Sequence, residues 1–271
     1  MKLYRLAPLA LALALVGLFS TGCNKLKARD QLNKGVDAFR NAQFAQAVDH
    51  FQQAVTLDPT LVNARLYLAT AYEQEYVPGG ASSDNQKIGD KAIQTFQDVL
   101  KIDPKNTNAL GSIAQLYYQM KDFDKAKQYQ QELMQIEPNN PDPYYWIGVL
   151  NWLPCFQRTM QLRTDLHLTT PKDPAKPDVL PPLPKKAREQ LAEQNGSLVD
   201  EGIKALEKAI ELKPDYADAM SYLNLMYRQK ADIEEDPDAR EADLKKANDL
   251  VTKALALKKA AGAKAGSKPT T

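Results

Sequence analysis

Hydrophobic residues follow two different patterns along the chain. Near the N-terminus, Leu6 to Phe19 (LAPLALALALVGLF) form one apolar run of 14 residues. Downstream, small residues, aromatic residues and prolines recur in register, as they do in consecutive amphipathic helices that pack on one another. The pattern therefore separates an N-terminal apolar segment from a long, repetitive helical region.

Four turns that end predicted helices read alike, as LDPT, IDPKN, IEPNN and LKPD. Their prolines, Pro59, Pro104, Pro138 and Pro214, are spaced by 45, 34 and 76 residues. Proline ends a helix because it lacks the backbone N–H and its ring clashes with the preceding turn. The spacings equal 34, 34 plus 11 and 34 plus 42, which predicts a 34-residue repeat with insertions inside some copies.

The residues within this period resemble the tetratricopeptide-repeat (TPR) family, in which each repeat is a pair of antiparallel helices, A and B. The first copy carries Gly35, Phe44, Phe51 and Pro59 at the family's small, aromatic and proline positions. Small residues allow two helices to approach closely, and large aromatics fill the space beside them. The resemblance implies an all-α fold, a right-handed TPR superhelix of about five helix-pair repeats with one long Pro-rich insertion in repeat four.

The repeat register, together with the N-terminal features described below, predicts eight segments. We expect a cleaved signal peptide (1–22), a lipid-anchored tether that the resemblance given below implies (23–27), repeat one (28–61), repeat two with an 11-residue insertion (62–106), repeat three (107–140), repeat four with a 42-residue insertion (141–216), repeat five with an 11-residue insertion (217–261) and a disordered tail (262–271).

The insertions carry local signals of their own. In repeat four, Thr169 to Pro184 contain six prolines, which predicts an extended loop. We expect a short helix from Lys185 that ends at Asn195-Gly196, followed by helix B with a capping box at Ser197 and Asp200. In repeat five, Asp236-Pro237 predicts the start of a long helix B that reaches about Lys259.

The N-terminal segment has the features of an export signal. Lys2 and Arg5 precede the apolar run, and small residues precede Cys23. The 14-residue run is shorter than the roughly 20 residues that a membrane-spanning helix needs, so we expect cleavage.

The residues before Cys23 resemble the lipobox of bacterial lipoproteins, which implies that Cys23 is acylated and becomes the mature N-terminus. Ser20 stands where that family prefers Leu, so plain secretion after cleavage at the same bond remains the alternative. Asn24 follows the cysteine, and the resemblance then favours the outer membrane. Asn24 to Lys27 would place the first repeat within about 13–15 Å of the bilayer, a layout similar to that of outer-membrane TPR lipoproteins.

Composition argues against several function classes. The 35 basic and 34 acidic residues leave a net charge of +1, which provides no global field to hold nucleic acid. Two Cys and two His are too few for the common metal frameworks, so we expect no metal and no cofactor. Cys155 and His167 lie 12 residues apart but no nucleophile motif accompanies them, so we expect a buried structural thiol and no catalytic pair.

Two other polar features have simple interpretations. His50 is expected to face solvent. The acidic run from Asp232 to Asp243 (DIEEDPDAREAD) lacks the glycine and ligand spacing of a calcium loop, so we expect a solvated loop. The sequence contains no phosphate-binding glycine loop, no HExxH and no GxSxG, and an enzyme is therefore not expected.

The TPR resemblance implies that the A helices line a concave surface that binds an extended peptide or a partner's helix. Amide side chains on that surface can bond a partner's backbone, and Tyr and Trp supply rigid contact area. Packing between repeats is the alternative role for the aromatics. The candidate contact residues are Asn63, Tyr67, Thr70, Asn108, Gln115, Tyr118, Gln119, Tyr145, Trp146, Trp152, Tyr222 and Arg228.

These features predict an exported, membrane-anchored TPR scaffold that binds a protein or peptide partner in the bacterial envelope. A subunit of an outer-membrane assembly, pilus or secretion machine is one alternative. A homo-oligomer is another, because no separate capping helix follows repeat five. An envelope enzyme that acts on glycans is the least favoured.

Overall fold

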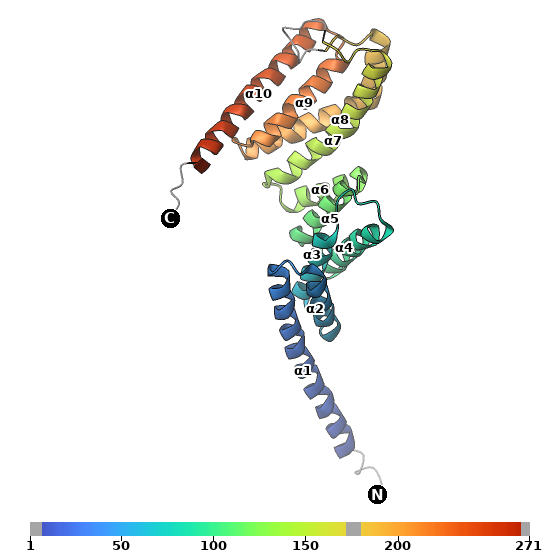
Figure 1. Ribbon diagram of the computed structural model, residues 1–271, viewed down its shortest axis with the longest axis vertical. Coiled ribbons are helices and arrows are strands. Elements are labelled where there is room, and N and C mark those ends of the chain that lie inside the picture. Colours follow the sequence, from blue (N-terminus) through green and yellow to red (C-terminus); the bar gives the residue numbers. More distant parts are fainter. Residues whose placement is uncertain (1–6, 172–179, 267–271) are drawn as a thin grey trace. The chain divides into compact units, whose positions relative to one another are not determined.

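The computed structural model describes residues 7–171 and 180–266, with the side chains of 23–171 and 180–262, and these residues form ten helices and no strand (Figure 1). The helices are α1 (Ala7–Arg40), α2 (Phe44–Leu57), α3 (Val62–Glu75), α4 (Ser83–Ile102), α5 (Thr107–Gln119), α6 (Phe123–Ile136), α7 (Pro141–Asp165), α8 (Lys185–Leu212), α9 (Ala217–Ile233) and α10 (Pro237–Gly266). The all-α fold of about five helix pairs is confirmed.

The chain forms two compact units, residues 1–129 and 130–271, and the boundary falls inside α6. The first unit has one core around Phe51, between α1, α2 and α3, and another around Phe96, between α3, α4 and α5. The second unit has its main core around Leu206 and Met226, between α7, α8, α9 and α10.

Paired helices approach each other closely at glycines of the repeat. A Cβ at Gly35 would lie 2.4 Å from the ring of Phe51, and Phe51 is fully buried. In the second unit, Gly148 has the same role against Leu206. The small and aromatic positions of the predicted repeat thus form the contacts between paired helices, as the period indicated.

Polar side chains cap several helices and hold the turn in repeat two. Ser82 accepts a hydrogen bond from the backbone N–H of Asn85 at the start of α4 (3.1 Å). The side chain of Asn85 in turn accepts from the N–H of Val77 and donates to the carbonyl of Gly80 (2.8 and 3.0 Å). Gly79 between them has a φ of 76°, which glycine adopts without strain. The predicted turn is present, and the insertion lengthens α4 to 20 residues.

The prediction of a helix break at Asn195-Gly196 is wrong, because α8 runs without interruption from Lys185 to Leu212. Asn195 is buried and its side-chain amide donates to the carbonyl of Cys155 on α7 (3.4 Å). Its side-chain oxygen accepts from Arg158 (3.0 Å). Contacts with α7 therefore keep these residues helical against their local preference for a turn.

The inserted residues of repeat four mostly extend its two helices, since α7 has 25 residues and α8 has 28. Half of the predicted extended loop, residues 172–179, lies outside the described residues. At the end of the loop, Pro184 has φ −57° and ψ 151°, close to the polyproline conformation.

Two boundaries differ from the sequence-based segments. The tether at 23–27 is helical as part of α1, so Asn24 to Lys27 span about 6 Å along the axis, less than the expected distance. At the other end, α10 continues to Gly266, so the predicted disordered tail begins within a helix; residues 267–271 lie outside the described residues.

Two glycines in the second unit provide a matched stability test. A Cβ at Gly148 would lie 2.3 Å from Cγ of the fully buried Leu206, so Gly148→Ala is expected to lower the free energy of unfolding by about 1–3 kcal/mol. Gly196 lies inside α8 with nothing within 4 Å of an added Cβ, so Gly196→Ala is expected to raise it by about 0.5–1 kcal/mol.

Guanidinium chloride unfolding followed by tryptophan fluorescence measures both effects, because both tryptophans, Trp146 and Trp152, belong to the second unit. A destabilised Gly196→Ala variant would contradict the uninterrupted α8.

Candidate functional site

Aromatic side chains gather on the A helices of the second unit, α7 and α9, which pack against each other. Six of them form one continuous chain of ring contacts, which we call the aromatic cluster. Its members are Tyr145, Trp146, Trp152, Phe156, Tyr216 and Tyr222.

Tyr145 is the centre of one half of the cluster. Its ring centroid lies 5.2 Å from that of Tyr216, 5.5 Å from that of Trp146 and 5.6 Å from that of Tyr222. Tyr222 then contacts Trp152 edge-on at 5.5 Å, and these offset and edge-to-face geometries are the favoured ones for aromatic pairs. Phe156 is exposed and the other five members are half-buried, so the cluster is a partly exposed surface that packs against the main core of the unit.

The sequence predicted four members of the aromatic cluster and missed two. Phe156 stacks on Trp152 at 4.8 Å and is 39% exposed. Its position four residues after Trp152, on the same face of α7, was the signal for it. Tyr216 precedes α9, and its hydroxyl donates to a carboxylate oxygen of Asp142 (2.9 Å). Burial, and then this hydrogen bond, raise the pKa of Tyr216.

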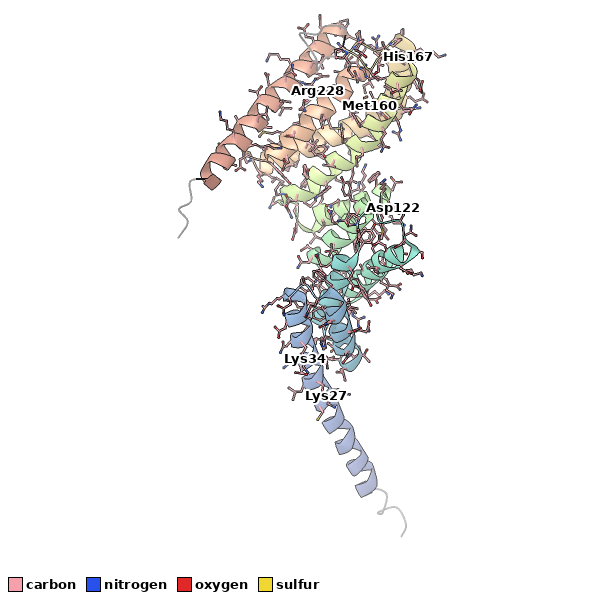
Figure 2. The ribbon with its side chains drawn as sticks, in the orientation of Figure 1. Lys27, Lys34, Asp122, Met160, His167 and Arg228 are labelled. Carbon is pink, nitrogen blue, oxygen red and sulfur yellow. The ribbon has the colours of Figure 1, made fainter. Side chains whose placement is uncertain are left out.

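A pocket of about 150 Å³ opens beside the cluster, between α7, α9 and α10. Trp152 and Arg228, both predicted contact residues, line it. Figure 2 labels Met160 on α7 and Arg228 on α9, two of the lining residues. The remaining lining residues are Phe156, Thr159, Arg163, Leu180, Leu225, Gln229, Asp232, Arg240 and Leu244.

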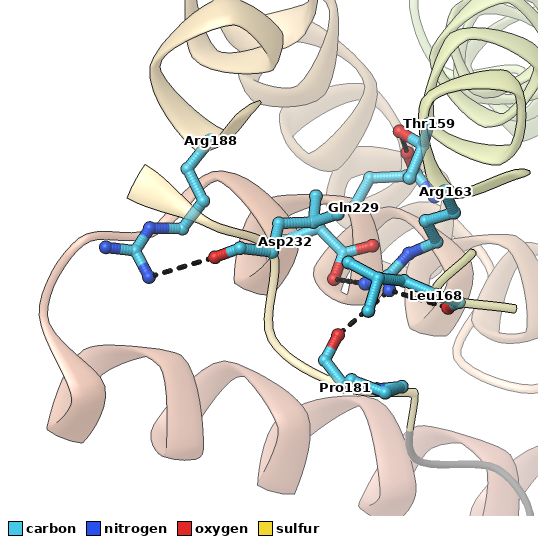
Figure 3. Close-up of polar contacts among 8 residues, drawn as sticks. Thr159, Arg163, Leu168, Pro181, Arg188, Gln229 and Asp232 are labelled. Atoms are coloured by element: carbon cyan, nitrogen blue, oxygen red, sulfur yellow. Dashed lines mark hydrogen bonds and ion pairs between the residues drawn. The ribbon is translucent and has the colours of Figure 1, made fainter. Parts of the chain in front are cut away.

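Arg163 lies at the buried side of this pocket with 1% of its surface exposed. Figure 3 shows its guanidinium between Asp232 on α9 and the segment that connects α7 to α8. One terminal nitrogen is 2.5 Å from Oδ1 of Asp232, and the other donates to the carbonyl of Pro181 at 2.9 Å. Arg163 on α7 therefore links that helix both to α9 and, through Pro181, to the segment that precedes α8.

Burial raises the pKa of the Asp232 carboxyl, and the charge of Arg163 opposes that rise. Next to this pair, Thr159 donates a hydrogen bond to the side-chain oxygen of Gln229 (2.7 Å), again between α7 and α9. The pocket is thus lined by hydrogen-bonded polar side chains as well as by aromatic ones. Sequence reasoning missed Arg163, because no local pattern marks a buried arginine.

Arg228 is held in place by two amides. Its Nε donates to Asn224 on the same helix (2.9 Å), and one terminal nitrogen donates to Asn248 on α10 (2.8 Å). Tyr227 next to it donates to Glu207 (2.8 Å), and burial followed by this hydrogen bond raises the pKa of Tyr227.

The predicted contact residues of the first unit lie on α3 and α5, and several of them make contacts within the unit, including Tyr118, whose ring centroid lies 6.0 Å from that of Phe123. Tyr67 is 42% exposed and stacks on Phe51 at 5.5 Å, which matches the packing alternative. Thr70 donates to the carbonyl of Leu66 in its own helix (3.0 Å). Among the predicted residues of this unit, Asn63 and Asn108 are exposed, and Gln115, Tyr118 and Gln119 are half-buried.

Glu73 was not among the predicted residues, although it lies on α3 one turn after Thr70. It is partly buried, and desolvation raises the pKa of its carboxyl while a hydrogen bond with Ser112 on α5 opposes the rise. Its spacing from Thr70 was the signal that could have found it.

Cys155 is fully buried, as expected for a structural thiol, with its Sγ 4.0 Å from the carbonyl of Asn195. His50 is half-buried and bonded to the Gln31 side chain (2.7 Å), so the expectation of a solvent-facing side chain is wrong. Among the described residues, no three His, Cys, Asp or Glu side chains are grouped as metal ligands would be.

The expectation of a solvated loop at Asp232 to Asp243 is also wrong at both ends of the run. Asp232 belongs to α9 and pairs with Arg163, whereas Asp243 belongs to α10 and is 4% exposed. Lys230 and Lys246 each lie 3.6 Å from a carboxylate oxygen of Asp243. Two acidic residues thus join α9 and α10 to the rest of the unit.

Cys23 is exposed on α1, and the first buried side chain after it is Ala28. Within the described part of the chain, no helix is both long and apolar enough to span a bilayer.

Comparisons with known proteins point to one family. Residues 89–149 match the family model for the tetratricopeptide repeat. Interferon-induced protein with tetratricopeptide repeats 2 of Cricetulus griseus is 29% identical over 181 residues, 67% of this chain and 31% of that protein. Hsp70-Hsp90 organizing protein 3 of Arabidopsis thaliana is 26% identical over 115 residues, 42% of this chain and 19% of that one. The chain thus spans about a third or less of these relatives.

Solved structures share the fold across most of the chain. A structure of MamA protein has a TM-score of 0.53 at 16% identity and covers 90% of this chain and 97% of that one. MamA from Desulfovibrio magneticus RS-1 has a TM-score of 0.54 at 16% identity, with 86% and 96% covered. YrrB, described as a TPR protein with an unusual peptide-binding site, has a TM-score of 0.50 at 15% identity, with 84% and 90% covered. Residues 89–149 therefore match a tetratricopeptide repeat, and the described helices share the fold of tetratricopeptide-repeat structures.

Proposed function

We propose that this protein is an exported, membrane-anchored TPR scaffold that binds a protein or peptide partner through the A helices of its second unit. The observation that carries the proposal is the aromatic cluster on α7 and α9. Interlocked Tyr and Trp side chains lose little conformational entropy on binding, which is why such residues dominate protein interfaces.

The scaffold acts by affinity and proximity. The aromatic cluster supplies apolar contact area, and the guanidinium of Arg228 beside it is held in place by Asn224 and Asn248. The similar proteins support a binding role, since one is named an Hsp70-Hsp90 organizing protein and YrrB is described with a peptide-binding site. The described chain offers no comparable support for catalysis.

We place the scaffold at the outer membrane, on its periplasmic face, through an acyl group on Cys23. The residue is exposed and five residues before the first buried position of the repeats, so an acyl chain there would not disturb the core. The charged residues Lys25 and Lys27 that follow it are also exposed, as expected next to a headgroup layer.

Two adjacent tyrosines give a matched test of the binding surface. Tyr145 belongs to the aromatic cluster, whereas the half-buried Tyr144 lies outside it and donates to the carbonyl of Pro138. Tyr145→Ala is expected to weaken capture of the partner about thirtyfold, the effect of losing an interface hot spot of about 2 kcal/mol. Tyr144→Ala should leave capture unchanged.

The measurement is crosslinked capture from bacterial envelopes, read by mass spectrometry, with the melting temperature of each variant recorded to confirm folding. Equal capture of the same partner by the parent and by a folded Tyr145→Ala variant would overturn the proposed surface.

A further inference from the structure

We propose that the pocket between α7, α9 and α10 binds an acidic peptide by enclosing one aromatic side chain of that peptide and pairing the adjacent carboxylate. The inference rests on the proposed function, because it names the chemistry of the partner at the same surface. Three properties of the pocket support this chemistry: its size, its unsatisfied donors and its charge.

The size and walls of the pocket suit one ring. Its volume is about 150 Å³, and a protein cavity of about that volume holds a benzene molecule. Trp152 and Phe156 form a stacked pair on one side, and the other apolar lining side chains are Met160, Leu180, Leu225 and Leu244. An inserted aromatic side chain would gain apolar burial and ring contacts.

Two lining residues have donors that nothing in the described chain satisfies. The Nε–H of Arg163 and the indole Nε1–H of Trp152 are both shielded from solvent and have no acceptor among the described residues. Neither nitrogen is exposed to the pocket as it stands, so an acceptor reaches them only when the lining side chains move on binding. An unsatisfied buried donor is costly, and an occupant with an oxygen acceptor next to its ring would then relieve that cost.

The charge of the pocket selects the kind of acceptor. Its lining contains the guanidinium groups of Arg163, Arg228 and Arg240 but only one carboxylate, that of Asp232. Asp232 is already paired with Arg163, which leaves the pocket with an excess of positive charge. A carboxylate relieves that excess and forms strong hydrogen bonds with guanidinium groups, whereas a neutral amide would not.

The binding test uses the ¹⁵N-labelled protein and three synthetic peptides. The probe is acetyl-Gly-Ser-Phe-Glu-Ser-Gly-amide, and its analogues replace Phe with Ala or Glu with Gln. The chain has two tryptophans, so a Trp146→Phe variant assigns the indole signals. We expect the probe to shift the Nε1–H signal of Trp152 and the Nε–H signal of Arg163. The Gln analogue should bind at least tenfold more weakly, and the Ala analogue should not bind measurably.

Two variants of lining residues separate the contribution of charge to peptide binding from the contribution of the pocket's shape. The Arg240→Gln variant should bind the probe more weakly than the parent does, while its affinity for the Gln analogue should be unchanged. The Met160→Trp variant should fill the pocket and abolish binding of both peptides. Lys253→Gln is the matched control, since Lys253 is exposed on α10 and does not line the pocket.

Two outcomes would overturn the inference. If the probe shifts signals of Tyr145 and Tyr222 without moving those of Trp152 and Arg163, the proposed binding surface stands but this pocket is not its anchor. If the probe at millimolar concentration shifts no signal, the pocket does not bind an aromatic residue next to a carboxylate. The capture experiment with the Tyr145→Ala variant then still tests the proposed binding surface on its own.

Discussion

Replacing Arg163 with methionine is expected to lower the free energy of unfolding of the second unit by about 3–5 kcal/mol. Methionine keeps the length and apolar stem of the side chain but leaves Asp232, whose side chain is 15% exposed, without its ion-pair partner. The loss of one partner of a largely buried pair has effects of this size. The carbonyl of Pro181 loses its donor as well. Denaturant unfolding with tryptophan fluorescence measures the change.

Acidification should reduce this destabilisation. Burial already raises the pKa of Asp232 above its usual range, and Arg163 opposes the rise. A folded-state pKa above the unfolded value means that the folded chain binds the proton more readily, so stability increases as pH falls through that interval. Without Arg163 the pKa rises further, and the difference between variant and parent should be larger at pH 7 than at pH 5.

Two further variants test the assignment to the Arg163–Asp232 pair. The double variant Arg163→Met, Asp232→Asn removes the orphaned carboxylate and should recover about 1 kcal/mol or more of the loss. Gln157→Met, at an exposed position of the same helix, should stay within about 0.5 kcal/mol of the parent. A loss below about 1 kcal/mol in Arg163→Met would show that the pair does not hold the second unit together.

The repeat register predicted those parts of the fold in which each contact lies at a fixed spacing. Gly35 meets Phe51, and Gly148 lies at the corresponding position against Leu206, because the close approach of paired helices requires a small residue at that position of each copy. The long α10 was predicted for a similar reason, since Asp236-Pro237 is a local start signal. In each case the residues of one helix pair were sufficient to predict the feature.

The prediction failed where a contact distant in sequence overrides a local preference. Asn195-Gly196 reads as a turn, yet Asn195 bonds to Cys155 and Arg158, some 40 residues away, and α8 continues. Asp232 lies in an acidic run, but its partner Arg163 is 69 residues distant. Such pairings depend on how the inserted residues of repeat four fold back, which no period in the sequence encodes.

The candidate site shows the same division. Tyr145, Trp146, Trp152 and Tyr222 were predicted from the repeat, and the structure brings them together in one cluster. The polar side of the pocket was not predicted, because Arg163 and Arg240 lie in the inserted parts of repeats four and five. Residues outside the repeat register therefore give this surface its particular chemistry.

Substitution of Cys23 by serine is expected to move the protein from the membrane fraction to the soluble periplasmic fraction of a Gram-negative host. Acyl chains bind a bilayer through burial of their methylene groups, at about 0.8 kcal/mol each, so loss of the acylated thiol removes nearly all of the membrane affinity. Mass spectrometry of the parent should find Cys23 as the first residue with its acyl groups attached. Fractionation of parent and variant measures the change.

The matched control is Leu26→Ser, because Leu26 is 72% exposed on α1 only three residues further on, and this variant should remain in the membrane fraction. A parent protein that is soluble, cleaved before Cys23 and unmodified would contradict the anchor and support plain secretion. A Cys23→Ser variant that stays in the membrane fraction with residues 1–22 still attached would instead identify the N-terminal apolar segment as the membrane attachment. The helix α1 runs without a break from Ala7 to Arg40, so it would join that segment directly to the first repeat.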